Sequence, residues 1–542
     1  MRVGVDVGGT NTDAVLMDGT NVVAWTKQPT TADVSSGVAA AVENVTKKAC
    51  LRPNDVSAVM VGTTHFTNAL VERKNLDEVG IIRLASPSGE ALPPLTAWPP
   101  ELVSIVGRNI FLLPGGYEVD GREISPFDDI RVRDAARSLR QRGVTSVAIN
   151  SAFAPINASM EERAAAIVRE EHPGAVVTLS NTIARIGLIE RENAAVLNAA
   201  LSTLARRVMS SFDTALHALG IEAPLYISQN DGTLISADQA AAYPVMTIGS
   251  GPTNSMRGAA FLSGYTDAIV MDVGGTTTDI GVLSNGFPRE SSVAANIGGV
   301  RTNFRMPDIL AIGLGGGTRI HLEPALFGNS KLPASTAIGP DSVGYRIADE
   351  AFLFGGDTLT ASDVAAAAGL ADFGKSNLLP DLSQGVLQGL LGCIHDMFEE
   401  GVDRMKTSRA DIPIIAVGGG SFLVPNRLKG AVSVVRPDHA AVANAVGAAI
   451  AQVGGQIEQV VDYDREPREH VFDDMRAQVH RRCVEAGGNP ATVDVVEVDE
   501  VFLSYLPGRT AQVRMKAVAD LAQPVEAPRS AIPASKSSLH AH

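Results

Sequence analysis

The chain has 542 residues, of which 45% are hydrophobic, and a formal net charge of −15 with a pI near 5.2. This length allows about three to four domains, and the acidic charge argues against nucleic acid as a partner. The three cysteines, Cys50, Cys393 and Cys483, lie far apart, which indicates a reducing compartment and excludes a disulfide framework or a zinc ribbon.

The chain begins with an apolar run at residues 3–5 that leads into residues 6–13, a loop of sequence DVGGTNTD. A second apolar run, residues 14–16, and the turn pair at residues 18–19 follow. This pattern predicts a strand, a glycine turn, a second strand, a hairpin turn and a third strand. A strand that carries a charge cannot serve as the apolar stretch of a signal peptide, so we expect a cytoplasmic protein.

The next segments alternate between strand and helix patterns. A strand is predicted at residues 58–61, a helix at residues 131–141 and a strand at residues 144–150. His65, in the turn after the first of these strands, either contacts the substrate or starts a helix and bonds to backbone. Arg257, farther along, either faces the substrate or forms a structural ion pair.

The first loop returns at residues 272–279 as DVGGTTTD, identical to residues 6–13 at seven of eight positions. Apolar runs enter and leave this copy as well, and the turn pair at residues 285–286 follows. A single copy would fit a tight hairpin equally well. Two copies in matching surroundings indicate one nucleotide held between two related lobes.

The residue types of both loops suit a nucleotide phosphate. Paired glycines bring backbone N–H groups close to an anion, and threonine hydroxyls and the Asn11 amide add donors. Aspartates repel phosphate unless a cation stands between them, so Asp6 and Asp272 are expected to hold hydrated Mg²⁺ or to orient a nucleophile. Asp13 and Asp279 either bind metal or substrate or cap the hairpin turns.

One further motif requires a structural test. Residues 369–376, GLADFGKS, match the Walker A pattern letter for letter. A P-loop needs a strand before it and a helix after it, whereas residues 364–368 favour a helix and Pro380 soon follows. We therefore interpret Gly369 as a helix C-cap and the match as coincidence.

A third glycine loop follows a buried-strand pattern at residues 412–417. The loop, residues 418–421, has the sequence GGGS, and its bare backbone is suited to the flat face of an adenosine. The apolar run at residues 439–453 is predicted to be a packed helix and is too short to span a bilayer. We therefore expect an adenosine site here and no membrane association.

The composition changes beyond residue 455. A charged helix pattern at residues 466–483 and strand-like runs at 493–502 and 510–518 predict a small α/β appendage. The proline-containing tail is predicted to be flexible. The predicted organisation is an N-terminal lobe at 1–183, a second lobe at 184–455, the appendage at 456–522 and the tail at 523–542.

The order of two phosphate loops and a late glycine loop resembles the superfamily of ATPases that includes actin, hexokinase and the heat-shock chaperones. Within that superfamily the sequence is most similar to the hydantoinase/oxoprolinase family, in the short form of its hydantoinase A type. The matching segments are residues 4–13, 62–73, 250–252, 272–276, 312–318, 355–357 and 360–363. The chain departs from many family members at residues 253–257, and its region after residue 455 is shorter than in longer relatives, so the resemblance leaves the substrate open.

This resemblance implies an α/β fold with two actin-like, ribonuclease H-like lobes, a nucleotide cleft between them, and ATP and Mg²⁺ as cofactors. The expected nucleotide contacts are Gly8, Gly9, Thr10, Asn11, Thr12, Gly274, Gly275, Thr276, Thr277, Gly418, Gly419, Gly420 and Ser421. The expected catalytic residues are Asp6, Asp13, Asp272 and Asp279, with the metal at Asp6 and Asp272 and substrate contacts at His65 and Arg257.

The resemblance also implies a chemistry. Related enzymes hydrolyse hydantoins, oxoproline and lactams at the expense of ATP, and phosphorylation of the amide oxygen would overcome the partial double-bond character of the C–N bond. The chain has no Ser/His/Asp array in a persuasive context and no histidine metal motif, which favours a reaction driven by ATP.

We therefore expect the ATP-binding subunit of a cyclic-amide hydrolase that works with a second, hydantoinase B-like or other dedicated subunit. Two alternatives stay open. A carboxylase subunit, like the relatives that carboxylate acetone, would show bicarbonate-dependent ATP turnover. An actin-like ATPase switch or activator would lack ring-opening activity, and a filament former would pellet with ATP.

Overall fold

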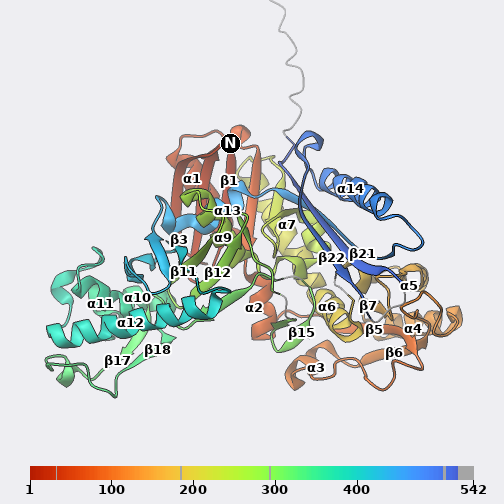
Figure 1. The fold of residues 1–542 in the computed structure, drawn as a ribbon, viewed down its shortest axis with the longest axis horizontal. Coiled ribbons are helices and arrows are strands. Elements are labelled where there is room, and N and C mark those ends of the chain that lie inside the picture. The colour runs from red at the N-terminus through yellow and green to blue at the C-terminus, as the bar shows by residue number, and fades with distance from the viewer. Residues whose placement is uncertain (32, 184–185, 292–293, 305, 505–507, 523–542) are drawn as a thin grey trace, which may run out of the picture.

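The computed structural model describes the chain except for residues 32, 184–185, 292–293, 305, 505–507 and 523–542. The predicted flexible tail thus lies outside the described residues. The described part forms α/β lobes, and its two largest sheets, of nine and six strands, each contain one copy of the repeated loop (Figure 1).

Both copies of the repeat fold as the sequence predicts, as three strands joined by a glycine turn and a hairpin turn. The strands are β1 (Arg2–Val7), β2 (Asn11–Asp18) and β3 (Asn21–Pro29) in the first copy, and β11 (Ala268–Val273), β12 (Thr278–Ser284) and β13 (Phe287–Pro288) in the second. In each copy the two aspartates lie opposite one another, Asp6 with Asp13 and Asp272 with Asp279. Directly opposed residues share one face of a sheet, so each pair of carboxylates points the same way.

The first sheet has the order β22-β23-β21-β10-β9-β4-β1-β2-β3 and joins strands from both ends of the chain. Its other members are β4 (Ala58–Thr63), β9 (Leu225–Ser228), β10 (Leu234–Ser236), β21 (Val453–Asp462), β22 (Asp494–Phe502) and β23 (Thr510–Ala519). Helix α14 (Arg468–Glu485) covers the C-terminal strands. The helix and two strands predicted after residue 455 are confirmed, and they extend the sheet that contains β1. The domain bounds stay a prediction.

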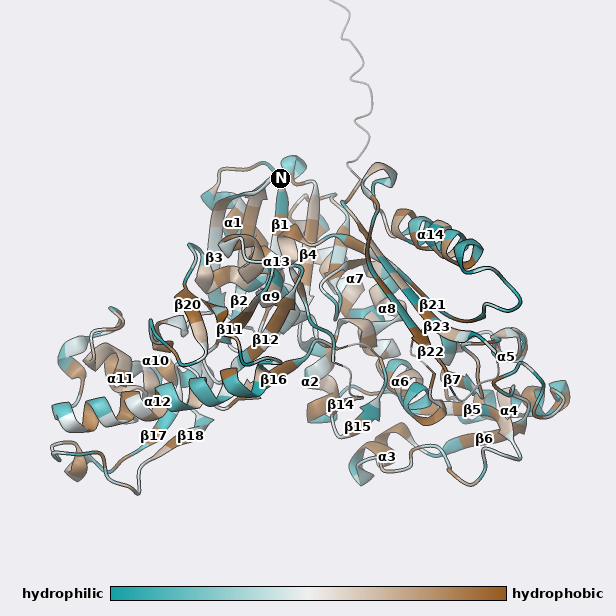
Figure 2. Cartoon of the chain, in the orientation of Figure 1, coloured by the Kyte–Doolittle hydropathy of each residue, from teal (hydrophilic) through white to brown (hydrophobic). Residues whose placement is uncertain are grey.

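The second sheet has the order β13-β12-β11-β19-β20, and β16 (Ile309–Ile312) pairs with β12. It includes β19 (Ile412–Val417), as predicted, and β20 (Ala431–Val435). The long helix α12 (Gln384–Met405) packs one face on the core under β11 and β12, and its outer face is hydrophilic (Figure 2).

The Walker A match falls after a helix, as expected for a coincidence. Helix α11 (Ala361–Ala367) precedes it, and Gly369 has φ +72° with its N–H donating to the Ala366 carbonyl at 3.0 Å. Ser376 begins a single 3-10 turn. Gly369 therefore ends a helix rather than opening a P-loop.

A smaller parallel sheet, of order β6-β5-β7-β8, forms a separate layer. Its strands are β5 (Val79–Ser86), β6 (Asn109–Pro114), β7 (Ser146–Ser151) and β8 (Val176–Leu179). Helices α4 (Asp129–Arg142) and α5 (Ser159–Glu171) pack against it. The helix and strand predicted between residues 131 and 150 are thus confirmed.

Two helices join the large sheets, α9 (Ser250–Ser263) and α13 (Ala443–Ile450), and they cross at backbone contact. A Cβ on Gly258 would lie 1.8 Å from the Ala443 carbonyl oxygen, and one on Gly447 would lie 1.9 Å from the Asn254 carbonyl oxygen. Glycine is therefore required at both positions for this close approach.

We expect Gly447→Ala to destabilise the fold by about 3 kcal/mol, because the added methyl group forces two packed backbones apart. Gly392→Ala is the matched control: it lies in α12 with open space around the added Cβ, so higher helix propensity should stabilise the fold by about 1 kcal/mol. Urea unfolding of both variants measures these changes. Wild-type stability of Gly447→Ala would contradict the crossing described here.

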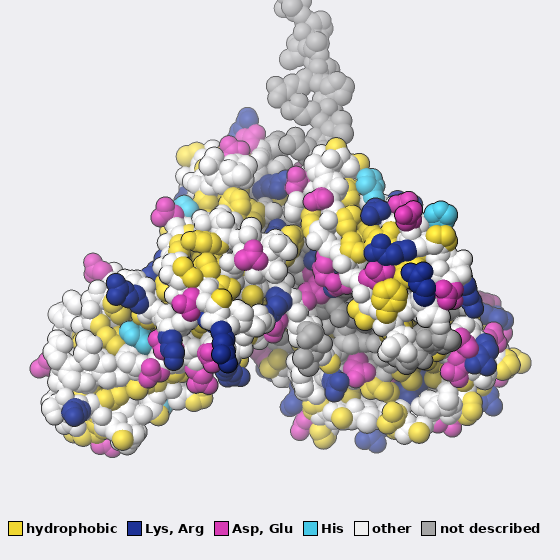
Figure 3. All heavy atoms as spheres, viewed as in Figure 1, with side chains coloured by type: hydrophobic (Ala, Val, Ile, Leu, Met, Phe, Trp, Pro, Cys, Tyr) yellow, Lys and Arg dark blue, Asp and Glu magenta, His cyan; other side chains and the backbone are white. Residues whose placement is uncertain are grey.

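None of the helices in the described part of the chain is long and apolar enough to cross a membrane. On the face shown in Figure 3, acidic and basic side chains are interspersed. The surface is hollowed between the part of the molecule that contains α12 and the part that contains α4 (Figures 1 and 3).

Candidate functional site

A cleft of about 640 Å³ lies between the two copies of the repeat, a volume within the usual range for ligand sites. Its lining brings together residues far apart in the sequence. The predicted site residues that line it are Asp6, Gly8, Gly9, Thr10, Asn11, Asp13, Asp272, Gly274, Gly275, Thr276, Thr277, Asp279, Gly418 and Gly419. The two glycine turns face each other, since a Cβ on Gly275 would lie 3.7 Å from the Thr10 hydroxyl.

Three residues assigned to nucleotide binding lie outside this lining. Thr12 is buried on the opposite face of β2, as strand alternation requires, with its hydroxyl 3.3 Å from that of Thr30. The Gly420 N–H donates to the Val273 carbonyl at 2.8 Å, and Ser421 begins a single 3-10 turn. The third loop thus presents its first two glycines to the cleft.

The two residues assigned to the substrate also lie outside the lining. His65 is the first residue of α2 (His65–Glu72), where its N–H donates to the Thr63 hydroxyl at 3.2 Å, and burial lowers the pKa of its imidazole. Arg257 donates to the Gly286 carbonyl at 2.7 Å and stacks on the Phe287 ring, 3.9 Å from its centroid. Arg257 therefore supports the hairpin of the second repeat, and the substrate roles stay predictions.

Asp6 is held by amides from both crossing helices. Asn254 of α9 donates to one carboxylate oxygen at 3.1 Å, and Asn444 of α13 donates to the other at 3.1 Å and to Asp13 at 2.9 Å. Gly62 leaves room for this contact, since its Cβ would lie 2.3 Å from the nearer Asp6 oxygen. The helix crossing thus sets the orientation of the Asp6 carboxylate.

Lys27 is the cation that faces the first aspartate pair. Its ammonium donates to both Asp13 oxygens, at 2.9 and 2.8 Å, and its side chain is 28% exposed in the cleft. In the second repeat Ala311 of β16 lies beside Asp279 instead. The described lining thus has one lysine for five carboxylates, of which Asp308 pairs with Arg289 at 2.6 Å. The aspartates of the second repeat have no such partner in the described lining, so the two halves of the cleft differ in charge.

This charge distribution shifts the acidity of the carboxyl groups. Burial, with repulsion from Asp13, raises the pKa of Asp6 to about 7 although the two asparagines oppose the shift. Burial and the nearby Asp272 raise the pKa of Asp279 to about 7. Burial also raises the pKa of Asp272, against a hydrogen bond from Ser255 and the charge of Lys27. A divalent cation would offset this crowded negative charge.

The donor set fits Mg²⁺ rather than a metal held entirely by protein. Within the described ranges there is no group of three or more His, Cys, Asp or Glu side chains that could hold a metal ion. Mg²⁺ commonly keeps several waters and is bound through one or two carboxylates together with phosphate oxygens. Asp6 and Asp272, on facing strands, supply carboxylates of this kind.

In the metal-free and nucleotide-free chain, we expect Asp6 and Asp279 to make thermal stability fall as pH rises from about 4 to 7 and to have little further effect above that. The folded pKa values of Asp6 and Asp279 are near 7, above the ordinary 3.8, so the folded state binds more protons and loses this advantage as pH rises through 7. Asp6→Asn should flatten the dependence, measured as melting temperature against pH in EDTA. An equal slope in the variant would contradict the assignment.

Four residues around the carboxylates were not anticipated from the sequence: Lys27, Asn254, Ser255 and Asn444. A signal existed for two of them. Asn254 and Ser255 fall in residues 253–257, where the chain departs from the pattern of many family members, and both contact cleft aspartates. Lys27 and Asn444 depend on strand register and helix placement, which local patterns do not show.

Two family profiles match the chain. Residues 2–172 match the hydantoinase/oxoprolinase N-terminal region, and residues 191–375 match hydantoinase/oxoprolinase. The chain is 29% identical to the alpha subunit of caprolactamase from Pseudomonas jessenii, over 68% of this chain and 55% of that protein. It is 26% identical to the acetophenone carboxylase gamma subunit of Aromatoleum aromaticum, over 67% and 52%. The matches thus span about half the length of these curated relatives.

Two solved structures share the fold. The ATP-dependent caprolactamase from Pseudomonas jessenii superposes with a TM-score of 0.75 at 21% identity, over 98% of this chain and 91% of that chain. The nucleotide-free structure of acetone carboxylase superposes with a TM-score of 0.67 at 18% identity, over 97% and 88%. The predicted two-lobed α/β fold with a C-terminal α/β region is thereby confirmed.

Proposed function

The chain belongs to the hydantoinase/oxoprolinase family, and from this membership we propose that it is the ATP-binding subunit of an ATP-dependent cyclic-amide hydrolase. The observation that carries the proposal is the cleft between the two repeats, in which both glycine turns, the third glycine loop and the four aspartates of the repeats converge. The relative named as the alpha subunit of caprolactamase supports the cyclic-amide substrate class.

In this proposal the backbone of the two glycine turns binds the phosphates of ATP. The start of α9 adds to this, because Gly251 lines the cleft and no side chain caps the first turn. Free N–H groups at a helix start favour an anion, here the phosphoryl group that moves from ATP to the amide oxygen.

The carboxylates and the residues that contact them would bind the metal and balance the charge in the cleft. Asp6 and Asp272 would hold a hydrated Mg²⁺, which supplies positive charge to the phosphates. The amides of Asn254 and Asn444 fix the orientation of Asp6. Lys27 neutralises Asp13 and so limits repulsion of the incoming phosphate. These residues position and stabilise charge, which is most of what phosphoryl transfer requires.

A carboxylase subunit is the second candidate. It is favoured by the 26% identity to the gamma subunit of acetophenone carboxylase. It is also favoured by the 26% identity to the acetone carboxylase beta subunit of Xanthobacter autotrophicus, over 45% of this chain. ATP turnover that requires bicarbonate and a ketone would support this candidate, and ATP turnover that requires a cyclic amide would support the hydrolase.

ATP with Mg²⁺ is expected to raise the melting temperature of the purified chain, because ligand binding to the folded state stabilises it by mass action. The gain is about 2.7 kcal/mol at a ligand concentration of about 100 times Kd. Lys375→Ala should keep this shift, because Lys375 lies after a helix cap and outside the cleft lining.

Differential scanning fluorimetry with and without millimolar ATP measures the effect. A transition that does not move would count against a nucleotide site in the cleft. Loss of the shift in Lys375→Ala would instead show that the Walker-like segment binds the nucleotide.

A further inference from the structure

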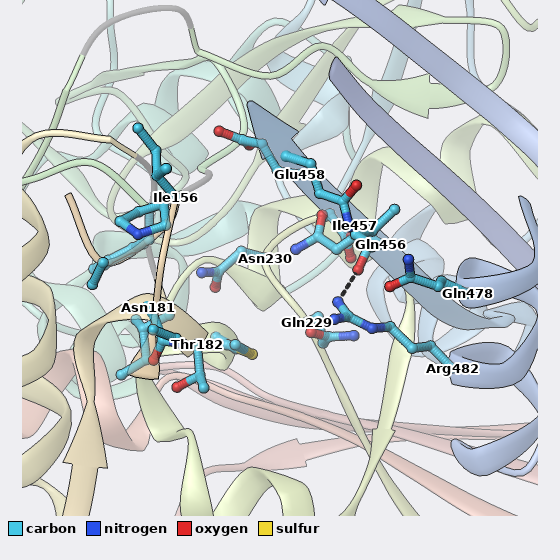
Figure 4. A pocket seen from close by; sticks show the side chains of 18 residues that line it. Ile156, Asn181, Thr182, Gln229, Asn230, Gln456, Ile457, Glu458, Gln478 and Arg482 are labelled. Carbon is cyan, nitrogen blue, oxygen red and sulfur yellow. Dashed lines mark hydrogen bonds between the residues drawn. The ribbon is translucent and has the colours of Figure 1, made fainter. Parts of the chain in front are cut away.

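A second cavity, of about 380 Å³, lies apart from the nucleotide cleft at the carboxyl ends of β7 and β8 (Figure 4). In open parallel sheets, ligands bind outside the carboxyl ends of the strands. The opposite wall comes from the turn between β9 and β10, from β21 and from α14. Two sheets and a helix from distant parts of the chain meet here, and such junctions are common places for ligand pockets.

A thin wall separates this pocket from the cleft. Met246 lines the pocket, and Ile248, two residues later, lines the cleft. Asn230 of the pocket accepts a hydrogen bond from the N–H of Gly249 at 2.6 Å, and its backbone carbonyl accepts one from the Thr253 hydroxyl at 2.9 Å. Asn230 thus connects the pocket directly to the start of α9, which faces the cleft.

The pocket wall is rich in carboxamide side chains. They are Asn181, Gln229, Asn230, Gln456, Gln459 and Gln478. Figure 4 shows Ile156 and Asn181 on one side of the space, facing Ile457 and its neighbours on the other. A carboxamide offers both donors and acceptors, so the wall suits a ligand that carries both, together with apolar atoms for the isoleucines.

The charges of the pocket lining nearly balance. Asp231 pairs with Lys516 at 2.7 Å, and Glu458 accepts a hydrogen bond from Gln512. Arg482, the cation of the described lining, donates to the Gln456 carbonyl. Lys516 offsets Asp231, and the remaining two charges, Glu458 and Arg482, are opposite in sign, so the lining has little net charge and favours a neutral ligand.

One buried polar atom of the pocket wall is unsatisfied within the described part of the chain. The side-chain carbonyl oxygen of Asn181 is buried with no hydrogen-bond donor among the described residues. A buried acceptor without a donor destabilises the folded state. A small rotation of this amide toward the pocket would let a ligand N–H satisfy it.

We propose that this pocket binds a neutral cyclic amide, the substrate class on which the proposed function already rests. A ring amide presents one N–H and one carbonyl oxygen side by side, with methylene groups behind them, and so complements the carboxamides and the isoleucines. The wall between the two cavities separates this ring from the nucleotide, so the pocket is a second amide site, apart from the one at which the phosphoryl group is transferred. Asn230 and Gly249 connect the two, so amide and nucleotide binding influence each other.

The test is to titrate δ-valerolactam into the full chain without nucleotide, by calorimetry, and to repeat it with δ-valerolactone, which lacks the N–H. Asn181→Leu and Gln478→Leu should weaken lactam binding at least tenfold. Gln452→Leu is the matched control, because Gln452 is an amide outside the lining that bonds to Asp520. The lactone should bind at least tenfold more weakly than the lactam.

The thermal shift caused by MgATP separates this proposal from the proposed function. It should persist in both pocket variants, and Asn181→Leu should keep the wild-type melting temperature, since its carbonyl has no partner to lose. Equal lactam affinity in wild type and both variants, or a wild type that responds to MgATP but binds no lactam, would overturn the pocket assignment alone. A missing MgATP shift beside intact, variant-sensitive lactam binding would overturn the proposed function and support the pocket.

Discussion

Replacing Asp6 or Asp272 by Asn is expected to lower ATP turnover by about a hundredfold or more while the chain stays folded. Each change keeps the side-chain volume and removes one negative charge from the position where Mg²⁺ is proposed to lie. Folding should tolerate the change, because burial already disfavours the charged form of both carboxylates. The melting temperature at neutral pH should therefore stay near or above that of the wild type.

Turnover is measured by phosphate release with the partner subunit present, beside circular dichroism and thermal melts of each variant. Asp18→Asn is the matched control, because Asp18 lies exposed at the far end of β2. It should keep full activity. Wild-type turnover in either cleft variant would refute the metal assignment.

The isolated chain is expected to open no cyclic amide at a measurable rate, even with ATP and Mg²⁺. The described lining of the cleft offers carboxylates, glycines, hydroxyls, amides and Lys27, which bind and activate by phosphorylation, but it contains no histidine or cysteine to activate an attacking water. The relatives with matching sequences are named as subunits, which supports a partner as the source of this group.

The measurement is ring opening of a panel of lactams and hydantoins, followed by chromatography, with and without a hydantoinase B-like subunit. Addition of the partner should raise the rate from background to at least a hundredfold above it. Robust ring opening by the purified chain alone would refute the division of labour.

The two hairpins that line the cleft could be predicted because they follow local rules. Alternation, paired glycines and turn pairs act within about ten residues, so both copies of the repeat appear in the sequence as they fold. The opposition of Asp6 to Asp13 and of Asp272 to Asp279 follows from the same short spacing. The two glycine turns could therefore be assigned to one site before the fold was known.

The position of Lys27 opposite Asp13 could not be predicted from local sequence patterns. An uninterrupted ladder from the turn at residues 18–21 would place Thr26 opposite Asp13. A bulge between the two strands shifts the register by one residue and places Lys27 there instead. A shift of one residue exchanges the faces of the strand, so the counter-charge of Asp13 could not be deduced from the turn alone.

By itself, the sequence determined the strand and turn pattern, the family and the repeated aspartates, because these depend on residue types and on spacing along the chain. The tertiary structure decided which groups surround them. Asp6 meets amides 248 and 438 positions away, and it does so because α9 and α13 cross where glycines let their backbones touch. The carboxamide pocket behind the cleft arises in the same way, from a turn, two sheets and a helix that only the folded chain brings together. Contacts of this range depend on how large surfaces pack, and no local pattern encodes them.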